Sequence, residues 1–292
     1  MLPKLLPTSC DLQRLAAANR LHFSAIVDEK ERELGVHWLA HYRDLGVPLE
    51  RMTIHFISRH AARVAAFSSQ LAASGVRDIR WSNRSWSSSD MTRVMDAKLR
   101  SMPPDHYLIS PDLDEFYTYP CDLALHRNDA WCAFMRDPIA ANGKLSSVQP
   151  DVPITQQFPY VCYLRQHLRD GPTTLQKPTL IRATGLTNGG RVRSMNGPHA
   201  LSHGERCNLT GWFDHYTMTR EQLELSAIKQ SDKLAVGQRG GASYYSRVHE
   251  LLLLANSSDV RGHPMCAPNG FRHREQYWPP CTSRRISECR AH

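Results

Sequence analysis

The first 110 residues alternate between segments patterned as buried strands and segments patterned as amphipathic helices. The strands are predicted over 22–27, 52–58, 78–83 and 106–110, and the helices between them over 29–46, 62–75 and 90–102. The strand segments are short apolar runs, whereas in the helical segments apolar residues recur every three to four positions. Strands joined by helices at this spacing form βαβ units with right-handed crossovers. The alternation therefore predicts an α/β fold built on a largely parallel sheet.

Boundary residues support these helices. Gly46 and Gly75 stand where the first two helices should end, and glycine readily takes the conformation found just after a helix C-terminus. Asp90 precedes the third helix and is predicted to cap its first N–H groups. A further helix is predicted over 219–235, because Thr219 and Gln222 have the spacing of a capping box.

The composition is that of an ordinary globular protein. Of the 292 residues, 41% are hydrophobic and 22% are charged, and no apolar run approaches the roughly 20 residues of a membrane helix. The net charge of +8, from 36 basic and 28 acidic residues, would suit an anionic ligand, but a diffuse solvated surface is the favoured interpretation. The basic residues are spread along the chain rather than gathered in a stripe with interleaved aromatics. The sequence therefore predicts neither nucleic-acid binding nor a membrane span.

Cysteines and glycosylation signals bear on the compartment. The eight cysteines include no Cys-x-x-Cys pair, which argues against a structural zinc site, and their even number permits disulfides. Asn-x-Ser/Thr triplets begin at Asn83, Asn208 and Asn256 and favour a secretory compartment. The first residues lack the apolar core of a signal peptide. The sequence therefore predicts either a cytoplasmic protein or a Golgi-luminal one whose anchor lies upstream of this chain.

The chain divides into three predicted parts. Residues 1–120 form the α/β half, and residues 121–260 form a less regular half of the same domain, in which prolines interrupt the strands. One short strand of that half is predicted over 177–185. In residues 261–292 the composition shifts to Pro, Arg, His and Cys, which predicts a wrapping tail.

The segment with the clearest chemistry follows the fourth predicted strand. Asp112, Asp114 and Glu115 come directly after it, at the strand edge where open α/β sheets bind ligands. In an extended segment, residues two apart point to the same side, so Asp112 and Asp114 should present their carboxylates together, with Leu113 buried between them. Paired carboxylates suit Mn²⁺ or Mg²⁺, which also bind phosphate. The alternative is a charged turn that faces water.

Two motifs together resemble a known enzyme family. The first predicted helix carries Trp38-x-x-His41 and ends in Leu45-Gly46-Val47, and Asp112 to Phe116 reads Asp-Leu-Asp-Glu-Phe. This pair of motifs resembles the GT-A glycosyltransferases of families 2 and 92, over residues 22 to 235. The resemblance implies a GT-A (Rossmann-like) fold. It also implies transfer of a hexose or pentose from a nucleotide-sugar, commonly a UDP-sugar, to a glycan or glycoprotein acceptor.

The resemblance further implies roles for individual residues. Metal ligands are expected at Asp112, Asp114 and His215. Nucleotide-sugar contacts are expected at Asp28, Glu29, Asp112, Lys177 and Arg182. The residues alone leave open whether His215 is instead a buried histidine beside a helix, and whether Lys177 and Arg182 are solvated charges on a strand.

The catalytic base and the nucleotide segment are less defined. The resemblance implies transfer with inversion, which needs a general base near the acceptor hydroxyl, and Glu115, Asp151 and Asp214 are the leading acidic candidates. The family's Asn-Glu after the first strand is Asp28-Glu29 here. The acidic turn usual after its second strand is replaced by Ser58-Arg59-His60.

Three other functions stay open at this point. The chain could be a catalytically silent GT-A-like domain that binds nucleotide or glycan. It could be another metal-dependent nucleotide enzyme such as a nucleotidyltransferase, although the first strand does not run into the glycine-rich loop that would favour one. The third is a basic nucleic-acid-binding protein.

Overall fold

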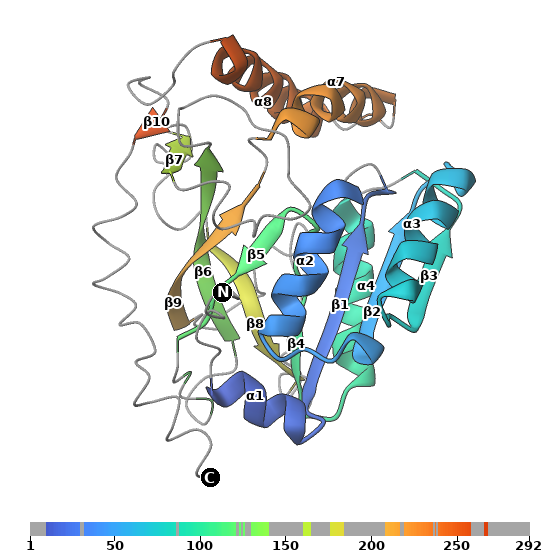
Figure 1. The fold of residues 1–292 in the computed structure, drawn as a ribbon, viewed down its shortest axis with the longest axis vertical. Helices are drawn as coiled ribbons and strands as arrows, with labels where there is room; N and C mark the ends of the chain where they lie inside the picture. Colours follow the sequence, from blue (N-terminus) through green and yellow to red (C-terminus); the bar gives the residue numbers. More distant parts are fainter. Residues whose placement is uncertain are drawn as a thin grey trace, which may run out of the picture.

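The described part of the chain forms a ten-stranded sheet flanked by helices (Figure 1). A computed structural model describes residues 10–29, 32–85, 88–120, 123, 125, 130–139, 160–164, 176–183, 208–216, 219–235, 237, 239–257 and 266–267. The helices are α1 (Cys10–Ala17), α2 (Arg32–Asp44), α3 (Ala61–Ala73), α4 (Ser88–Ser101), α7 (Arg220–Ala235) and α8 (Arg239–Ser257), with a 3-10 turn η2 (Leu49–Arg51). The strands are β1 (Leu21–Val27), β2 (Met52–Ile57), β3 (Asp78–Ser82), β4 (Tyr107–Ile109), β5 (Glu115–Tyr117), β6 (Ala130–Ile139), β7 (Tyr160–Leu164), β8 (Gln176–Arg182), β9 (Asn208–His215) and β10 (Cys266–Ala267).

The sheet joins a parallel half to an antiparallel one. Its order is β10-β7-β6-β8-β4-β1-β2-β3, and β1 pairs in parallel with both β2 and β4 while β2 pairs in parallel with β3. The direction changes at β8, which is antiparallel to β4 and to β6. Strand β9 adds to β6, and the short β5 adds to β9. The predicted fold class is therefore confirmed: an α/β sheet, parallel in its first half, between helices.

Apolar side chains from α2 and α3 bury one face of the parallel half, and α4 covers the other. Trp38 of α2 is fully buried against Phe23 of β1, with ring centroids 5.1 Å apart. On the opposite face, Met95 and Leu99 of α4 pack with Leu108 of β4. These two layers fix β1 and β4 side by side, and their carboxyl ends therefore open on one edge.

The close approach of α2 and α3 requires a glycine at position 35. A Cβ atom at Gly35 would lie 2.6 Å from Cε2 of Phe67, which is far inside normal contact. Gly35→Ala is therefore expected to lower the free energy of unfolding by about 1–3 kcal/mol through overpacking. A glycine-to-alanine change within a helix ordinarily raises stability by roughly 0.5–1 kcal/mol. Denaturant unfolding measures the sign.

The matched control for Gly35 is its neighbour. In a Phe67→Leu background the alanine methyl has room, so the same Gly35→Ala change should cost less than it does in the wild type. The difference between the two costs is the coupling energy of the pair. An alanine variant as stable as the wild type would show that α2 and α3 separate freely.

A histidine pair lies at the amino ends of β1 and β4, away from the acidic segment. His22 Nε2 is 2.7 Å from His106 Nδ1. Burial, followed by the charges of Lys98, His106 and Arg51, lowers the pKa of His22 from 6.5 to about 4. The unfolded chain therefore takes up this proton at a higher pH than the folded chain does.

The free energy of unfolding should consequently fall as the pH drops from 6.5 towards 4. His22→Gln should flatten that part of the stability curve, because the replacement does not titrate. Thermal melts at several pH values measure the effect. The exposed His60, replaced in the same way, is the control and should leave the slope unchanged.

From β1 to β4 the elements were predicted closely, with their ends shifted by at most three residues. Asp90 is the exception, because α4 begins at Ser88 and places Asp90 inside its first turn rather than before it. Its carboxylate is buried and pairs there with Arg84 at 2.6 Å and Arg93 at 3.3 Å. The predicted cap of α7 is present, with the Gln222 N–H donating to Thr219 Oγ1 at 3.3 Å.

Several elements were not predicted. One is α1 near the start of the chain, and the others are α8, β5, β6, β9 and β10. Cys132 of β6 is disulfide-bonded, in line with the even number of cysteines that permits such bonds. Of the predicted tail, Cys266–Ala267 is described and pairs with β7, so the three-part division of the chain stays a prediction.

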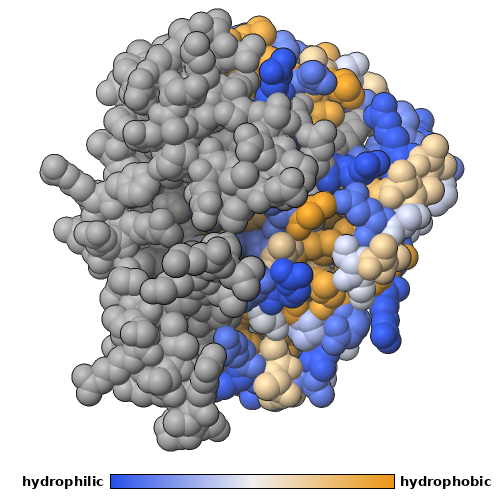
Figure 2. Space-filling model, in the orientation of Figure 1, coloured by the Kyte–Doolittle hydropathy of each residue, from blue (hydrophilic) through white to orange (hydrophobic). Residues whose placement is uncertain are grey.

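Helices α7 and α8 form a hairpin that lies across the carboxyl-end side of the parallel strands in Figure 1. Apolar side chains stand exposed on it, at Ile228, Leu234 and Leu253. In Figure 2, apolar atoms lie beside strongly hydrophilic ones over this region. None of the helices that the structure describes is long and apolar enough to cross a membrane.

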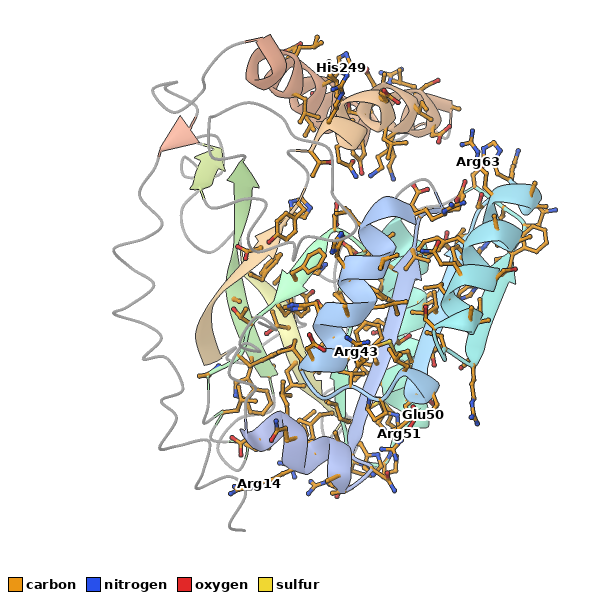
Figure 3. The ribbon with its side chains drawn as sticks, in the orientation of Figure 1. Arg14, Arg43, Glu50, Arg51, Arg63 and His249 are labelled. Carbon is orange, nitrogen blue, oxygen red and sulfur yellow. The ribbon has the colours of Figure 1, made fainter. Side chains whose placement is uncertain are left out.

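Basic side chains are scattered over the described surface. Arg14 on α1, Arg43 on α2 and Arg63 on α3 are exposed and come from separate elements (Figure 3).

Candidate functional site

The acidic segment lies where β4 ends, between β1 and β8 in the sheet. Its backbone forms a turn, in which the Glu115 N–H donates to the Asp112 carbonyl at 3.2 Å. The expectation of an extended segment is therefore wrong: the turn aims Asp112 and Asp114 at different partners. Leu113, as predicted, is buried in the core. The acids stand at the carboxyl edge of a parallel sheet, where such sheets bind ligands.

Asp112 and Glu115 share one buried lysine. Lys177 Nζ of β8 lies 3.0 Å from Asp112 Oδ2 and 2.5 Å from Glu115 Oε2. Glu115 Oε2 also accepts hydrogen bonds from the Tyr117 hydroxyl at 2.9 Å and the Asp112 N–H at 2.8 Å. The Glu115 side chain is 1% exposed, whereas that of Asp112 is 27% exposed. Glu115 therefore faces inward as an anchor, and Asp112 faces the solvent side.

Asp114 meets His215 through strand pairing. Strand β5 is antiparallel to β9, with Glu115 opposite His215. His215 Nε2 lies 3.3 Å from Asp114 Oδ2, and the Tyr216 N–H donates to the Asp114 carbonyl at 2.7 Å. Both side chains are 11% exposed. Residues about one hundred positions apart in the chain thus form a nearly buried carboxylate–imidazole pair.

Three side chains on one face of helix α2 form hydrogen bonds with the backbone of this segment and hold it in place. The Trp38 indole N–H donates to the Asp112 carbonyl at 2.9 Å, and the Tyr42 hydroxyl donates to the Glu115 carbonyl at 2.9 Å. His41 Nε2 lies 2.6 Å from the Tyr117 carbonyl. Positions 38, 41 and 42 fall on the same side of a helix. The Trp-x-x-His motif therefore orients the backbone that carries the acids.

Neighbouring charged residues keep Asp114 and Lys177 in their ionised forms. Burial alone raises the pKa of Asp114, but the charge and hydrogen bond of His215, followed by Lys229 and Lys177, hold that pKa well below its usual range. Burial alone lowers the pKa of Lys177, but Asp112 and Glu115 raise it above its ordinary value. Asp114 is thus ionised and Lys177 charged at neutral pH.

His41 behaves differently because burial dominates. Burial lowers the pKa of His41 below its ordinary value, against the opposing effects of the Tyr117 carbonyl and of Asp214. The imidazole is therefore neutral at neutral pH. Because its Nε2 faces a carbonyl oxygen, Nε2 carries the proton and donates it in a hydrogen bond.

The other predicted nucleotide-sugar contacts lie at opposite ends of the strands. Asp28 and Glu29 directly follow β1, which pairs with β4, so they share the edge of the acidic segment; Glu29 is buried. Arg182 lies opposite Tyr107, at the far end of β4, with its guanidinium 5.9 Å from the Tyr107 ring centroid. Arg182 lies five positions along β8 from Lys177, a distance of about 16 Å in an extended strand. The structure therefore does not bring Arg182 to the acids.

The predicted bases are also separated. Asp214 is 8% exposed and directly precedes His215 in β9. Successive strand residues project to opposite faces, so Asp214 and His215 do not point together. Asp151 lies outside the described residues. Of the three predicted bases, Glu115 has its Oε2 engaged by Lys177.

Lys229 of α7 was not anticipated as a site residue. Its charge acts on Asp114, and the side chain is 8% exposed. Its Nζ lies 3.3 Å from Gln222 Oε1 and 5.6 Å from the Tyr245 ring centroid. Polar residues recur along α7 at Thr219, Gln222, Ser226, Lys229 and Lys233, all of them buried. This recurrence of polar residues every three or four positions was the sequence signal that could have pointed to Lys229.

Two of the expected metal ligands, Asp114 and His215, have side chains in direct contact, and this spacing can be compared with that of ligands on a divalent cation. Adjacent ligands of an octahedral ion with bonds of about 2.1 Å lie about 3.0 Å apart. Asp114 Oδ2 and His215 Nε2 are 3.3 Å apart, which is the distance of their direct pairing and is also near that edge. Within the described ranges no three His, Cys, Asp or Glu side chains converge, and Asp112 is paired with Lys177. Mg²⁺ commonly takes one or two carboxylates together with substrate phosphates.

Comparisons with known proteins give distant structural likenesses. No protein-family model and no curated protein matches the chain. Solved structures similar to it include 4-diphosphocytidyl-2C-methyl-D-erythritol synthase, with 14% identity, a TM-score of 0.33, and coverage of 65% of this chain and 88% of the other. S. aureus TarS 1-349 in complex with UDP-GlcNAc has 11% identity and a TM-score of 0.35, with coverage of 83% and 74%.

A third similar structure is the mannosyltransferase PcManGT from Pyrobaculum calidifontis in complex with GDP-Man and Mn²⁺. It has 9% identity and a TM-score of 0.33, with coverage of 93% of this chain and 85% of the other. At such TM-scores and identities these likenesses carry no argument about function. The function is therefore argued from the geometry of the site.

Proposed function

We propose that the chain is a divalent-metal-dependent glycosyltransferase that moves a sugar from a nucleotide-sugar, of which a UDP-sugar is the leading candidate, to a glycan or glycoprotein acceptor. The observation that carries the proposal is the Asp114–His215 pair beside Asp112, at the carboxyl edge of a parallel sheet. Its resemblance to GT-A glycosyltransferases of families 2 and 92 in the Trp38 and Asp112–Phe116 motifs supports it. A charged turn facing water would not need a nearly buried carboxylate–imidazole pair.

The residues of the site have distinct parts in this proposal. In this proposal Asp114 and His215 would hold the cation together with the donor's diphosphate, and Asp112, which is partly exposed beside them, would add a further oxygen. The bound cation would neutralise the charge that develops on the leaving diphosphate. Asp28 and Glu29, at the end of the adjacent strand, are placed to contact the nucleotide.

Transfer breaks the bond between the anomeric carbon and the diphosphate oxygen and forms one to the acceptor oxygen. The acceptor hydroxyl loses its proton to a general base, and inversion follows if this is a single displacement. We keep Asp151 and Asp214 as candidates for the base. Glu115 is instead assigned to supporting Asp112, because it is buried and bonded to Lys177, Tyr117 and the Asp112 backbone.

The proposal is tested by thermal stability against a panel of nucleotide-sugars, with Mn²⁺ or with EDTA. A ligand at one hundred times its dissociation constant adds about 2.7 kcal/mol to the free energy of unfolding. We expect one nucleotide-sugar to stabilise the protein in Mn²⁺ and not in EDTA. Stabilisation by none, in either condition, would remove the proposal.

Product analysis then separates the remaining functions. Release of nucleoside diphosphate together with a glycosylated acceptor, or with free sugar when water replaces the acceptor, indicates a glycosyltransferase. Release of pyrophosphate from a nucleoside triphosphate indicates a nucleotidyltransferase. Binding that leads to neither product, with any acceptor glycan tried, indicates a silent nucleotide-binding domain.

A further inference from the structure

The candidate site contains a cation that belongs to the protein. The Lys177 side chain is 2% exposed and reaches Asp112 and Glu115 at 3.0 and 2.5 Å. It comes from β8, the antiparallel neighbour of β4, so the sheet itself sets its position. Because Asp112 is the more exposed partner, Lys177 lies on the buried side of that carboxylate.

The hydrogen bonds around Lys177 leave it little freedom. Glu115 Oε2 accepts hydrogen bonds from Lys177 Nζ, the Tyr117 hydroxyl and the Asp112 N–H. The backbone that carries both acids is fixed by Trp38 and Tyr42. A lysine held in this way cannot swing out to a ligand, so any effect on a ligand passes through Asp112.

The charge balance gives that effect a direction. Asp112, Asp114 and Glu115 would attract a free divalent cation strongly if nothing offset them, and they would repel a diphosphate. Lys177 offsets this charge from inside, and Lys229 of α7 adds a second positive charge that acts on Asp114. The site is thereby less favourable for a bare cation and more favourable for a cation bound to an anion.

Resting on the proposed function, we propose that Lys177 is a positioning residue that fixes Asp112 and makes the site take up its divalent cation as a complex with a nucleoside diphosphate rather than as the free ion. The ligand class is thus a metal–diphosphate complex. The wild type should bind free Mn²⁺ weakly, and UDP should strengthen Mn²⁺ binding markedly.

The test compares Lys177→Met with the wild type in two measurements. Free Mn²⁺ binding is followed by electron paramagnetic resonance, and UDP binding at fixed Mn²⁺ is followed by calorimetry. In the variant, free Mn²⁺ should bind as tightly as in the wild type or more tightly. UDP binding in Mn²⁺ should weaken about 10- to 100-fold, the range seen when a residue supporting a metal ligand is removed.

Three variants control for general damage. Lys177→Arg keeps the charge and should restore part of the UDP affinity. Lys98→Met removes a half-buried lysine of α4, bonded to Thr53 at 3.4 Å, and should change neither measurement. If Lys177→Met does not fold, Glu115→Gln with Lys177→Met removes both buried charges, and the same loss of UDP affinity is expected.

Each outcome decides the matter. Weaker UDP binding in Lys177→Met, with free Mn²⁺ bound as tightly as in the wild type or more tightly, supports the inference. Equal weakening of both, or no change in UDP affinity, overturns it while leaving the proposed function intact. A wild type that binds neither Mn²⁺ nor UDP removes the proposed function, and this inference with it.

Discussion

Asp114→Asn is expected to abolish Mn²⁺-dependent stabilisation by a nucleotide-sugar. The replacement keeps the shape of the side chain but removes the negative charge that faces His215 Nε2 at 3.3 Å. A neutral amide is a poor ligand for a hard divalent cation. Sugar transfer should fall about 100- to 1,000-fold, the usual cost of losing one group that stabilises developing charge.

Because Asp114 is paired with His215, Asp114→Asn should lower the stability of the fold as well as ligand binding, so both must be measured. Neighbouring charges hold the pKa of Asp114 below its usual range, so the ionised carboxylate stabilises the fold and the melting temperature of Asp114→Asn should drop somewhat in EDTA. The ligand-induced shift, taken as a difference from each variant's own EDTA melt, removes that baseline.

Asp105→Asn is the matched control. Its carboxylate is 54% exposed, pairs with Arg20 at 3.1 Å, and lies just before β4 rather than just after it. The same chemical change there should leave the ligand-induced shift unchanged. A full shift in Asp114→Asn would mean that the cation is not held by this residue.

The first half of the fold was predictable because its signals are local. Strands β1, β2 and β4 are short apolar runs, and Gly46 and Gly75, with φ of 93° and 107°, end α2 and α3 as a glycine after a helix does. Each of these signals lies within a few residues. None of them depends on which segments later meet.

The acidic segment was found in the sequence, but its partners were not placed. His215 and Lys177 were singled out by resemblance, and the contacts they make depend on β9 pairing with β5 and on β8 reversing direction beside β4. Such pairings leave no local pattern. Arg182 shows the consequence: it shares a strand with Lys177, yet the antiparallel register carries it to the other end of the sheet.

The turn at residues 112–115 shows a second limit. Spacing alone assigned both aspartates to one side, because an extended backbone was assumed. The Glu115 N–H donates to the Asp112 carbonyl, and the two carboxylates then meet two different partners, Lys177 and His215. Long-range contacts thus overrode the local alternation that the sequence suggested.

Trp38 is the residue whose loss should damage both the core and the site. It is fully buried, packs against Phe23 and Tyr42, and its indole N–H donates to the Asp112 carbonyl. Trp38→Ala should lower the free energy of unfolding by about 3–5 kcal/mol, the usual cost of emptying a buried aromatic position.

Trp38→Phe separates the two contributions. The phenyl ring keeps most of the packing but removes one of the two N–H groups that donate to the Asp112 carbonyl, leaving that of Glu115 at 3.2 Å. Losing this hydrogen bond should cost about 0.5–1.5 kcal/mol. Because that carbonyl belongs to the turn that carries the acids, we expect nucleotide-sugar binding in Mn²⁺ to weaken as well. Denaturant unfolding and calorimetry measure the two effects.

Phe56→Leu supplies the comparison, since Phe56 is equally buried but packs on Phe67, away from the acids. It should lower stability without weakening ligand binding in the folded protein. If Trp38→Phe behaved in the same way, the indole hydrogen bond would be a contribution to folding only. Weaker binding in Trp38→Phe alone would instead show that α2 sets the position of the acidic turn, and so connects the core of the parallel sheet to the proposed donor site.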